Sequence, residues 1–176
     1  VLFRSAVSRG APSKFIISDL PFLSYRQSVS RSVIAAQKLM QAGVQAIKLE
    51  GAAGNLSLIA YLVESGIPVM GHIGLTPQFI HSLGGYKVQG KTPAQAERLK
   101  QDALALEQAG CFAIVLECVP SLLAKEITAS LKIATIGIGA GVDTDGQVLV
   151  IQDLLGLNLD FKPKFVNHFL DGDRKS

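Results

Sequence analysis

The sequence has 176 residues, of which 48% are hydrophobic and 18% are charged. This apolar content suits one buried core and excludes a disordered chain, and a formal net charge of +3 is too small to indicate nucleic-acid binding. No apolar run reaches roughly 18 residues, so we expect no membrane-spanning helix. The two cysteines, Cys111 and Cys118, are too few for a disulfide framework, which predicts a reducing, cytoplasmic setting.

Short apolar runs alternate along the chain with longer helical patterns. The expected strands are residues 14–18, 46–49, 68–70, 113–116 and 134–138, with a weaker one at 163–166. The expected helices are residues 28–41, 56–64, 92–108, 122–130 and 152–157, and a turn is expected at 143–146. The strand runs are continuously apolar, which is typical of parallel strands buried on both faces. Repeated strand–helix–strand units predict an α/β fold.

Polar residues follow the ends of the first four strands. They are Asp19 after the first, Lys48 and Glu50 after the second, His72 after the third and Glu117 after the fourth. Right-handed crossovers place the carboxyl ends of parallel strands on one side, so these residues are expected to meet there. A ring of such ends favours a barrel over a doubly wound sheet.

The number of strands predicts an incomplete barrel. A complete (β/α)₈ barrel takes about 250 residues, and this sequence offers six strands. We therefore expect residues 1–176 to form a single partial TIM-barrel domain, a carboxyl-terminal fragment lacking the first two strand–helix units. Residues 1–8 are expected either to belong to the preceding helix or to be an artefact of the sequence.

Asp19 and Glu50 are candidates for a hard-cation site. Two carboxylates bind Mg²⁺ and leave room for waters and substrate oxygens. Alternatively, Asp19 caps a turn and Glu50 is a solvated loop acid. Lys48 stands two residues before Glu50, so on a strand both side chains point to the same face. At a barrel mouth Lys48 would pair with an anionic substrate; otherwise its charge extends to solvent.

His72 and Glu117 are candidates for proton transfer or substrate binding. His72 ends a buried strand between glycines and would donate a hydrogen bond to substrate or act as an acid; the alternative is a structural histidine. A carboxylate at the tip of a buried strand is partly desolvated, which raises its pKa and suits general acid–base work by Glu117. The alternative for Glu117 is an acid at the start of the next helix.

Six motifs occur in a specific order along the chain. They are DLPF at 19–22, KLEG at 48–51, GHIGLTPQ at 71–78, GGYKVQG at 84–90, LECVP at 116–120 and IGIGAG at 136–141. Together they closely resemble the ketopantoate hydroxymethyltransferase (3-methyl-2-oxobutanoate hydroxymethyltransferase) family. The resemblance implies a TIM barrel of the phosphoenolpyruvate/pyruvate type.

The resemblance also implies an activity in pantothenate and coenzyme A biosynthesis. Members transfer a hydroxymethyl group from 5,10-methylenetetrahydrofolate to 3-methyl-2-oxobutanoate through a Mg²⁺-stabilised enolate, giving 2-dehydropantoate. Homo-oligomers, decamers in particular, are implied, with small-molecule substrates and neither nucleic acid nor membrane as partners.

Individual residues of this chain match functional positions of the family. Asp19 and Glu50 match positions that hold Mg²⁺. Asp19, Lys48 and His72 match positions at the keto acid, with Lys48 against its carboxylate. Glu117 matches the assigned proton acceptor.

One family motif is absent from this sequence. The family carries Gly-Asp-Ser after its second strand, and no such tripeptide occurs here, so we expect the fragment alone to be inactive and the intact enzyme to be active. Two alternatives stay open at this point. One is another Mg²⁺-dependent, enolate-forming C–C lyase with the same barrel, which would turn over without folate; the other is a non-catalytic remnant.

Overall fold

The computed structural model describes residues 2–157 and 163–170. In chain order its strands are β1 (Ile17–Asp19), β2 (Ala46–Lys48), β3 (Val69–Gly74), β4 (Ala113–Glu117), β5 (Ala134–Ile138) and β6 (Gly146–Gln147). Its helices are α1 (Leu2–Gly10), α2 (Val29–Met40), α3 (Leu56–Glu64), the 3₁₀ turn η1 (Pro77–Phe79), α4 (Ile80–Leu83), α5 (Pro93–Gln108), α6 (Ser121–Ser130) and α7 (Ile151–Leu154).

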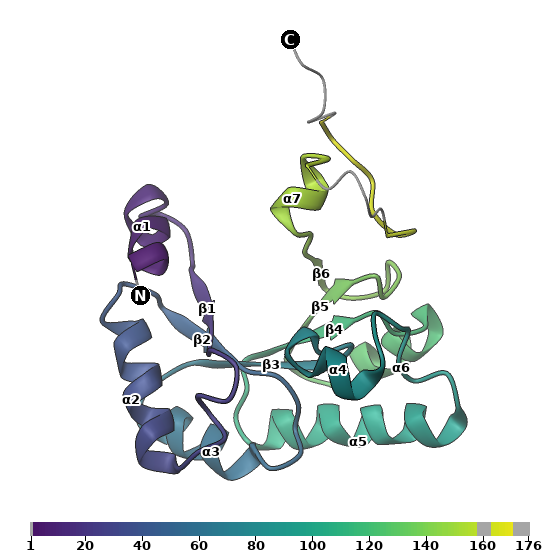
Figure 1. Ribbon diagram of the computed structural model, residues 1–176. Helices are drawn as coiled ribbons and strands as arrows, with labels where there is room; N and C mark the ends of the chain where they lie inside the picture. The colour runs from purple at the N-terminus through teal and green to yellow at the C-terminus, as the bar shows by residue number, and fades with distance from the viewer. Residues whose placement is uncertain (1, 158–162, 171–176) are drawn as a thin grey trace.

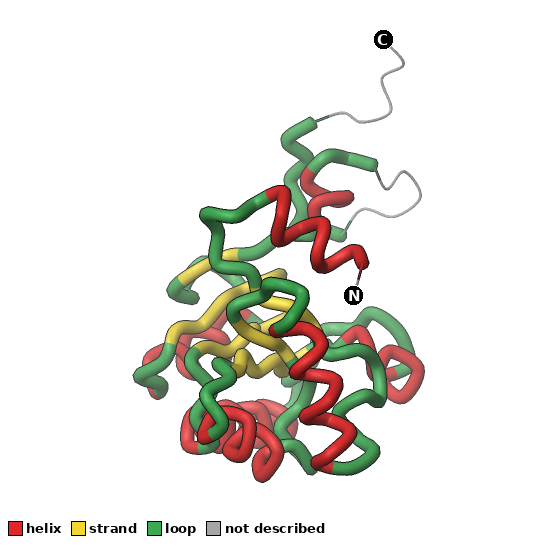
Figure 2. The backbone as a smooth tube through the Cα atoms, turned by 90° about the vertical axis from the view of Figure 1, so that its left-hand side faces the viewer, coloured by secondary structure: helices red, strands yellow, loops and turns green. Residues whose placement is uncertain are grey.

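The strands form one parallel sheet in the order β1-β2-β3-β4-β5-β6. Helices α2, α3, α5 and α6 lie along one side of this sheet (Figure 1), and the strands curl over them (Figure 2). This is the arrangement of part of a (β/α)₈ barrel, so the predicted incomplete barrel is confirmed. Among the described helices, none is long and apolar enough to cross a membrane.

Five of the expected strands are confirmed, and the sixth prediction was wrong. Residues 163–170 form turns and irregular structure, and the sixth strand is β6, at the place where a turn was expected. Tertiary contacts position β6: the Asp145 carboxylate accepts hydrogen bonds from the backbone N–H and hydroxyl of Thr135, at 2.8 and 3.0 Å. A strand of two residues has no apolar run from which a pattern could be read.

Helix α5 begins as its sequence predicts. Thr92 caps it, and the side chains of Thr92 and Gln95 each accept a hydrogen bond from the other residue's backbone N–H. This reciprocal capping satisfies two N–H groups that a helix start would otherwise leave unpaired. The chain after Gly110 enters β4 directly, so the helix end sets where that strand starts.

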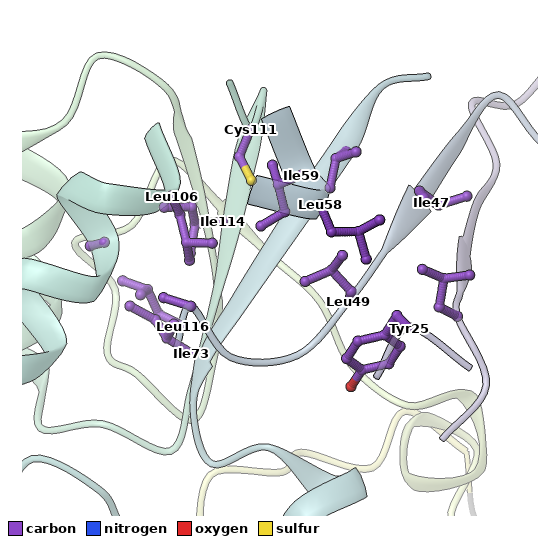
Figure 3. Close-up of a cluster of buried hydrophobic side chains, with 14 of the residues drawn as sticks. Tyr25, Ile47, Leu49, Leu58, Ile59, Ile73, Leu106, Cys111, Ile114 and Leu116 are labelled. Atoms are coloured by element: carbon purple, nitrogen blue, oxygen red, sulfur yellow. The ribbon is translucent and has the colours of Figure 1, made fainter. Parts of the chain in front are cut away.

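Two apolar clusters lie on opposite faces of the sheet. The larger one fills the space between strands and helices and includes Ile47, Ile73, Leu106, Ile114 and Leu116 (Figure 3). The smaller one consists of Met70, Ala113, Val115 and Ile138, with Ile17, Phe112 and Ile136 against it. Because side chains alternate along a strand, these clusters take alternate residues.

The smaller cluster lies on the face that carries the polar strand ends. Asp19 stands two residues after Ile17, His72 two residues after Met70, and Glu117 two residues after Val115. Each pair therefore shares one face of its strand, with the apolar residue first. The polar residue of each pair comes second, so it lies at the carboxyl edge of the sheet, and the apolar residue lies nearer the middle of the same face.

Helix α1 packs beside β1. The guanidinium of Arg4 donates to the Ser18 hydroxyl at 2.5 Å and to the backbone carbonyl of Asp19 at 2.9 Å. These bonds hold the carboxyl end of β1 from the outer edge of the sheet, because among the described strands β1 pairs with β2 alone.

We predict that Gly74→Ala destabilises the protein far more than Gly66→Ala. Both glycines have positive φ, at 90° and 84°. A Cβ at Gly74 would lie 2.2 Å from the Glu117 carbonyl oxygen, whereas nothing lies within 4 Å of one at Gly66. We expect losses of about 3 kcal/mol for Gly74→Ala and about 1 kcal/mol for Gly66→Ala in urea unfolding. Equal losses of unfolding free energy in the two variants would contradict this prediction, because they would show that backbone strain, and not the contact with Glu117, sets the cost at Gly74.

Candidate active site

Asp19 and Lys48 lie side by side at the carboxyl edge. The register of β1 and β2 pairs these two residues directly. The Lys48 Nζ is 2.5 Å from Asp19 Oδ1, and the Asp19 side chain is 52% exposed. Asp19 is thus an ion-paired carboxylate with open access to solvent, which leaves its second oxygen available to a ligand.

His72 is the central side chain of the cluster. It is 2% exposed, and its Nδ1 lies 3.2 Å from Lys48 Nζ. An ammonium group only donates hydrogen bonds, so Nδ1 accepts and a neutral His72 carries its hydrogen on Nε2. Nε2 lies 3.2 Å from Glu117 Oε2. The alignment of these two groups does not make a hydrogen bond, so Nε2 is a buried polar atom without a hydrogen-bond partner among the described residues.

Glu50 is a buried carboxylate, 4% exposed, rather than a solvated loop acid. Its Oε1 lies 3.8 Å from His72 Nδ1, and its Oε2 accepts from the backbone N–H of Gln78 at 2.9 Å. Burial raises the pKa of Glu50, against the opposing effects of His72, the Gln78 N–H and Lys48. The protein therefore keeps a carboxylate in a place where its charge is only partly compensated.

Glu117 is held by the backbone around it. Its carbonyl accepts from the Leu75 N–H at 2.8 Å, and this close approach requires the missing Cβ of Gly74. The next residue, Cys118, has φ of 48°, in the left-handed region. This conformation turns the chain sharply away after Glu117, so the carboxylate stays at the strand tip facing His72.

The two cysteines are not suited to nucleophilic chemistry. Burial, together with the neighbouring charge of Glu117, raises the pKa of Cys118 to about 11. Burial raises the pKa of Cys111 to about 12. Both thiols stay protonated at neutral pH, and the thiolate is the reactive form. The reactive groups gathered at this edge are therefore carboxylates, an ammonium and an imidazole.

The carboxylate oxygens of this site fit Mg²⁺ in part. Among residues 2–157 and 163–170 there is no group of three or more His, Cys, Asp or Glu that could hold a metal ion. Mg²⁺ is usually held by one or two carboxylates and completed by waters and substrate oxygens. Asp19 and Glu50 are hard oxygen donors of this kind, and the undercompensated charge of Glu50 suits a nearby cation.

The structure brings together all five predicted residues through contacts that run from β1 to β4. It also adds Asn55 and Gln78, which sequence reasoning did not single out. Asn55 is fully buried and donates to the backbone carbonyls of Glu50 and Gly51, at 3.0 and 2.7 Å. Gln78 is the last residue of the GHIGLTPQ motif, and its position in that motif could have identified it as a site residue from the sequence.

Comparison with known proteins identifies the family. The model of the family described as ketopantoate hydroxymethyltransferase matches residues 1–176. The chain belongs to this family. A 3-methyl-2-oxobutanoate hydroxymethyltransferase of Coxiella burnetii (strain Dugway 5J108-111) is 64% identical over 168 residues, covering 95% of this chain and 63% of the relative. One of Francisella tularensis subsp. tularensis (strain SCHU S4) is 60% identical over 169 residues, covering 96% and 64%.

The chain spans slightly less than two thirds of these ketopantoate hydroxymethyltransferase relatives. Solved structures of other proteins share its fold at low sequence identity. The carboxyl transferase domain of Rhizobium etli pyruvate carboxylase, solved with 3-bromopyruvate, matches with TM-score 0.57 and 12% identity, over 76% of this chain and 24% of that one. Deoxyribose phosphate aldolase from Aeropyrum pernix matches with TM-score 0.52 and 11% identity, over 82% and 67%. These likenesses show the barrel fold alone.

We predict that Glu50→Gln stabilises the protein increasingly as pH rises above 4.5, the ordinary pKa of a glutamate. The raised pKa of Glu50 means that the folded state binds this proton more tightly than the unfolded state. The stabilisation that comes from this tighter binding is fully present below pH 4.5, and it is lost as pH rises through the pKa that Glu50 has in the folded state. Gln cannot ionise, so it avoids that loss.

Urea unfolding of the wild type and Glu50→Gln at several pH values between about 4 and 8 measures this difference. Glu64→Gln, on the exposed end of α3, is the control and should show no such trend. A constant difference between wild type and Glu50→Gln over this range would contradict the prediction.

Proposed function

We propose that this chain carries the catalytic strand ends of a hydroxymethyltransferase of pantothenate and coenzyme A biosynthesis. The reaction joins the methylene carbon of 5,10-methylenetetrahydrofolate to C3 of 3-methyl-2-oxobutanoate. With one water consumed, the products are 2-dehydropantoate and tetrahydrofolate. The observation that carries the proposal is the continuous set of contacts Asp19–Lys48–His72–Glu117, with Glu50 against His72.

Lys48 is proposed to bind the carboxylate of the keto acid. Its ammonium has three donors, and Asp19 and His72 engage two of them. The contact with Asp19 and His72 holds the long lysine side chain in one place. A substrate carboxylate at the third donor would form a charge-assisted hydrogen bond, which is stronger than one between neutral groups.

Glu117 is proposed to take the C3 proton of the keto acid. It stands at the strand tip, with its side chain 16% exposed, at the carboxyl edge where a carboxylate can reach a bound substrate and act as a general base. His72 lies beside it, with Nε2 3.2 Å from Oε2 of the same carboxylate but not aligned for a hydrogen bond. The buried imidazole thus stands between the Lys48 ammonium and the Glu117 carboxylate.

Asp19 and Glu50 are proposed to hold Mg²⁺. When bound, Mg²⁺ supplies a Lewis acid that withdraws electron density from the keto oxygen and so acidifies C3. Asp19 contributes an exposed carboxylate, and Glu50 contributes a buried one whose orientation its neighbours fix. Lys48 pairs with Asp19, and its charge also acts to lower the pKa of Glu50, so it reduces the repulsion between these two acids.

We further propose that the enzyme is cytoplasmic and homo-oligomeric, and that the 176-residue chain alone is inactive. The two free cysteines support the cytoplasmic location, and the resemblance to the family supports the homo-oligomer. The absence of Gly-Asp-Ser from this sequence supports the inactivity of the chain alone. That motif would add an aspartate to the two carboxylates of the metal site.

Exchange of the C3 proton of 3-methyl-2-oxobutanoate in deuterated water tests the activity. We expect no exchange by the chain alone, and Mg²⁺-dependent exchange by the chain joined to the part of the Coxiella burnetii relative outside the matched region. Glu117→Gln in that fusion is expected to reduce the NMR-measured rate by about 10²–10⁴-fold. The exposed α6 variant Glu126→Gln is the control. A fusion that folds and shows no exchange would refute the proposed chemistry.

Lys48→Met in the same fusion tests substrate binding. Met keeps most of the side-chain length and removes the charge, so we expect the Kd for 3-methyl-2-oxobutanoate to rise by about 10–100-fold. Calorimetric titration with the keto acid measures it. Lys125→Met, on the exposed face of α6, should leave the Kd unchanged. An unchanged Kd in Lys48→Met would remove this residue from the substrate site.

A further inference from the structure

The carboxylate of Glu50 is held on the side that faces away from His72. Its Oε2 accepts the backbone N–H of Gln78 at 2.9 Å. Gln78 is the middle residue of the single turn η1, and the first N–H groups of such a turn have no partner within it. Glu50 therefore satisfies a group that would otherwise be unpaired, and its Oε1 is left on the His72 side.

The side chain of Gln78 is itself held at both ends. Its Nε2 donates to the Leu20 carbonyl at 2.9 Å, and its Oε1 accepts from the Tyr25 hydroxyl at 2.9 Å. A backbone carbonyl can only accept, so the amide has one orientation, and Tyr25 must be the donor. Burial raises the pKa of Tyr25 to about 12, so its hydroxyl keeps its proton at neutral pH.

These contacts join segments on either side of Glu50. Leu20 and Tyr25 follow β1, and Gln78 follows β3, whereas Glu50 follows β2, which lies between those strands. We call Tyr25 and Gln78, with their two side-chain hydrogen bonds, the Tyr25–Gln78 brace. Asn55 holds the Glu50 main chain independently, through its bond to the Glu50 carbonyl at 3.0 Å.

We propose that Gln78 is a positioning residue and that Tyr25 supports it, so that the Tyr25–Gln78 brace holds the Glu50 carboxylate in one orientation. The need for it is electrostatic. The neighbouring charge of Asp19 disfavours an ionised Glu50, so a free side chain would have a reason to turn away from this cluster. The expected effect of this orientation on Mg²⁺ binding rests on the proposed function, whereas the hydrogen bonds of the brace do not depend on it.

Tyr25→Phe tests the brace with the smallest possible change, because it removes only the hydroxyl. We expect hydrogen–deuterium exchange of the Gln78 backbone amide, followed by NMR, to become roughly ten-fold faster. Gln78→Met removes both side-chain bonds and should have at least as large an effect on that amide. The matched controls are Tyr61→Phe on the exposed face of α3 and Gln101→Met on α5. Neither control should change the exchange of the Gln78 amide.

Mg²⁺ titration calorimetry of the same variants, made in the fusion described above, measures the consequence. Residues that orient a metal ligand typically contribute 10–100-fold to metal affinity. We expect Tyr25→Phe to raise the Kd for Mg²⁺ by roughly ten-fold, with the Tm close to that of the Tyr61→Phe control. The double variant Tyr25→Phe/Gln78→Met should lose no more affinity than Gln78→Met alone, because both act through one brace.

The outcomes separate this proposal from the proposed function. Unchanged exchange of the Gln78 amide in Tyr25→Phe would overturn the brace. Faster exchange with an unchanged Kd for Mg²⁺ would overturn its positioning role. Faster exchange in a fusion that binds no Mg²⁺ even as wild type would support the brace and count against the proposed function.

Discussion

Side chains alternate between the two faces of a strand, and this constraint decides which groups can meet in this protein. The residues that face the helices are mostly apolar and form the main core, with Thr135 as a buried polar exception that contacts Thr128 of α6. The residues on the opposite face change from apolar to polar toward the carboxyl end, as in Met70 followed by His72 and Val115 followed by Glu117. A shift of one residue in any strand would exchange its two faces. The site therefore depends on the same register that builds the core.

The strand register also determines the order of contacts across the site. Asp19 pairs with Lys48 in the β1–β2 register, so their side chains touch directly. His72 lies farther along its own strand and reaches Lys48 on one side and Glu117 on the other. A buried imidazole thus joins groups on three strands. Its Nδ1 accepts from the ammonium, and its Nε2 lies 3.2 Å from the Glu117 carboxylate without forming a hydrogen bond.

Parts of the cluster are held in place at some cost in stability. Burial raises the pKa of Glu50, and Cys118 holds a left-handed backbone conformation that favours glycine. Buried carboxylates and strained backbone are both destabilising by themselves, and they persist only where the surrounding packing enforces them. Here the enforcing groups are the Gln78 N–H at Glu50 and the Leu75 N–H at Glu117. Both belong to the segment after β3, which makes that segment the support of the whole site.

The sequence by itself determined the class of fold, five of the six strands and the five side chains of the candidate site. These follow from local signals, such as continuous apolar runs, the Thr92 cap and polar residues placed directly after strands. The family motifs added the roles expected of those side chains. The prediction of a strand at 163–166 failed because a weak apolar run there forms a turn, in which the Val166 N–H bonds to the Pro163 carbonyl.

Only the tertiary structure decided the position of β6, the hydrogen-bonding state of His72 and the support of Glu50. Each depends on groups that are distant in the sequence: Asp145 with Thr135, Lys48 with His72, and Gln78 with Tyr25. A hydrogen bond between such groups forms when the fold brings them within about 3 Å, and no periodicity in the chain records it. Local pattern specifies which face a side chain occupies, whereas long-range packing selects its partner.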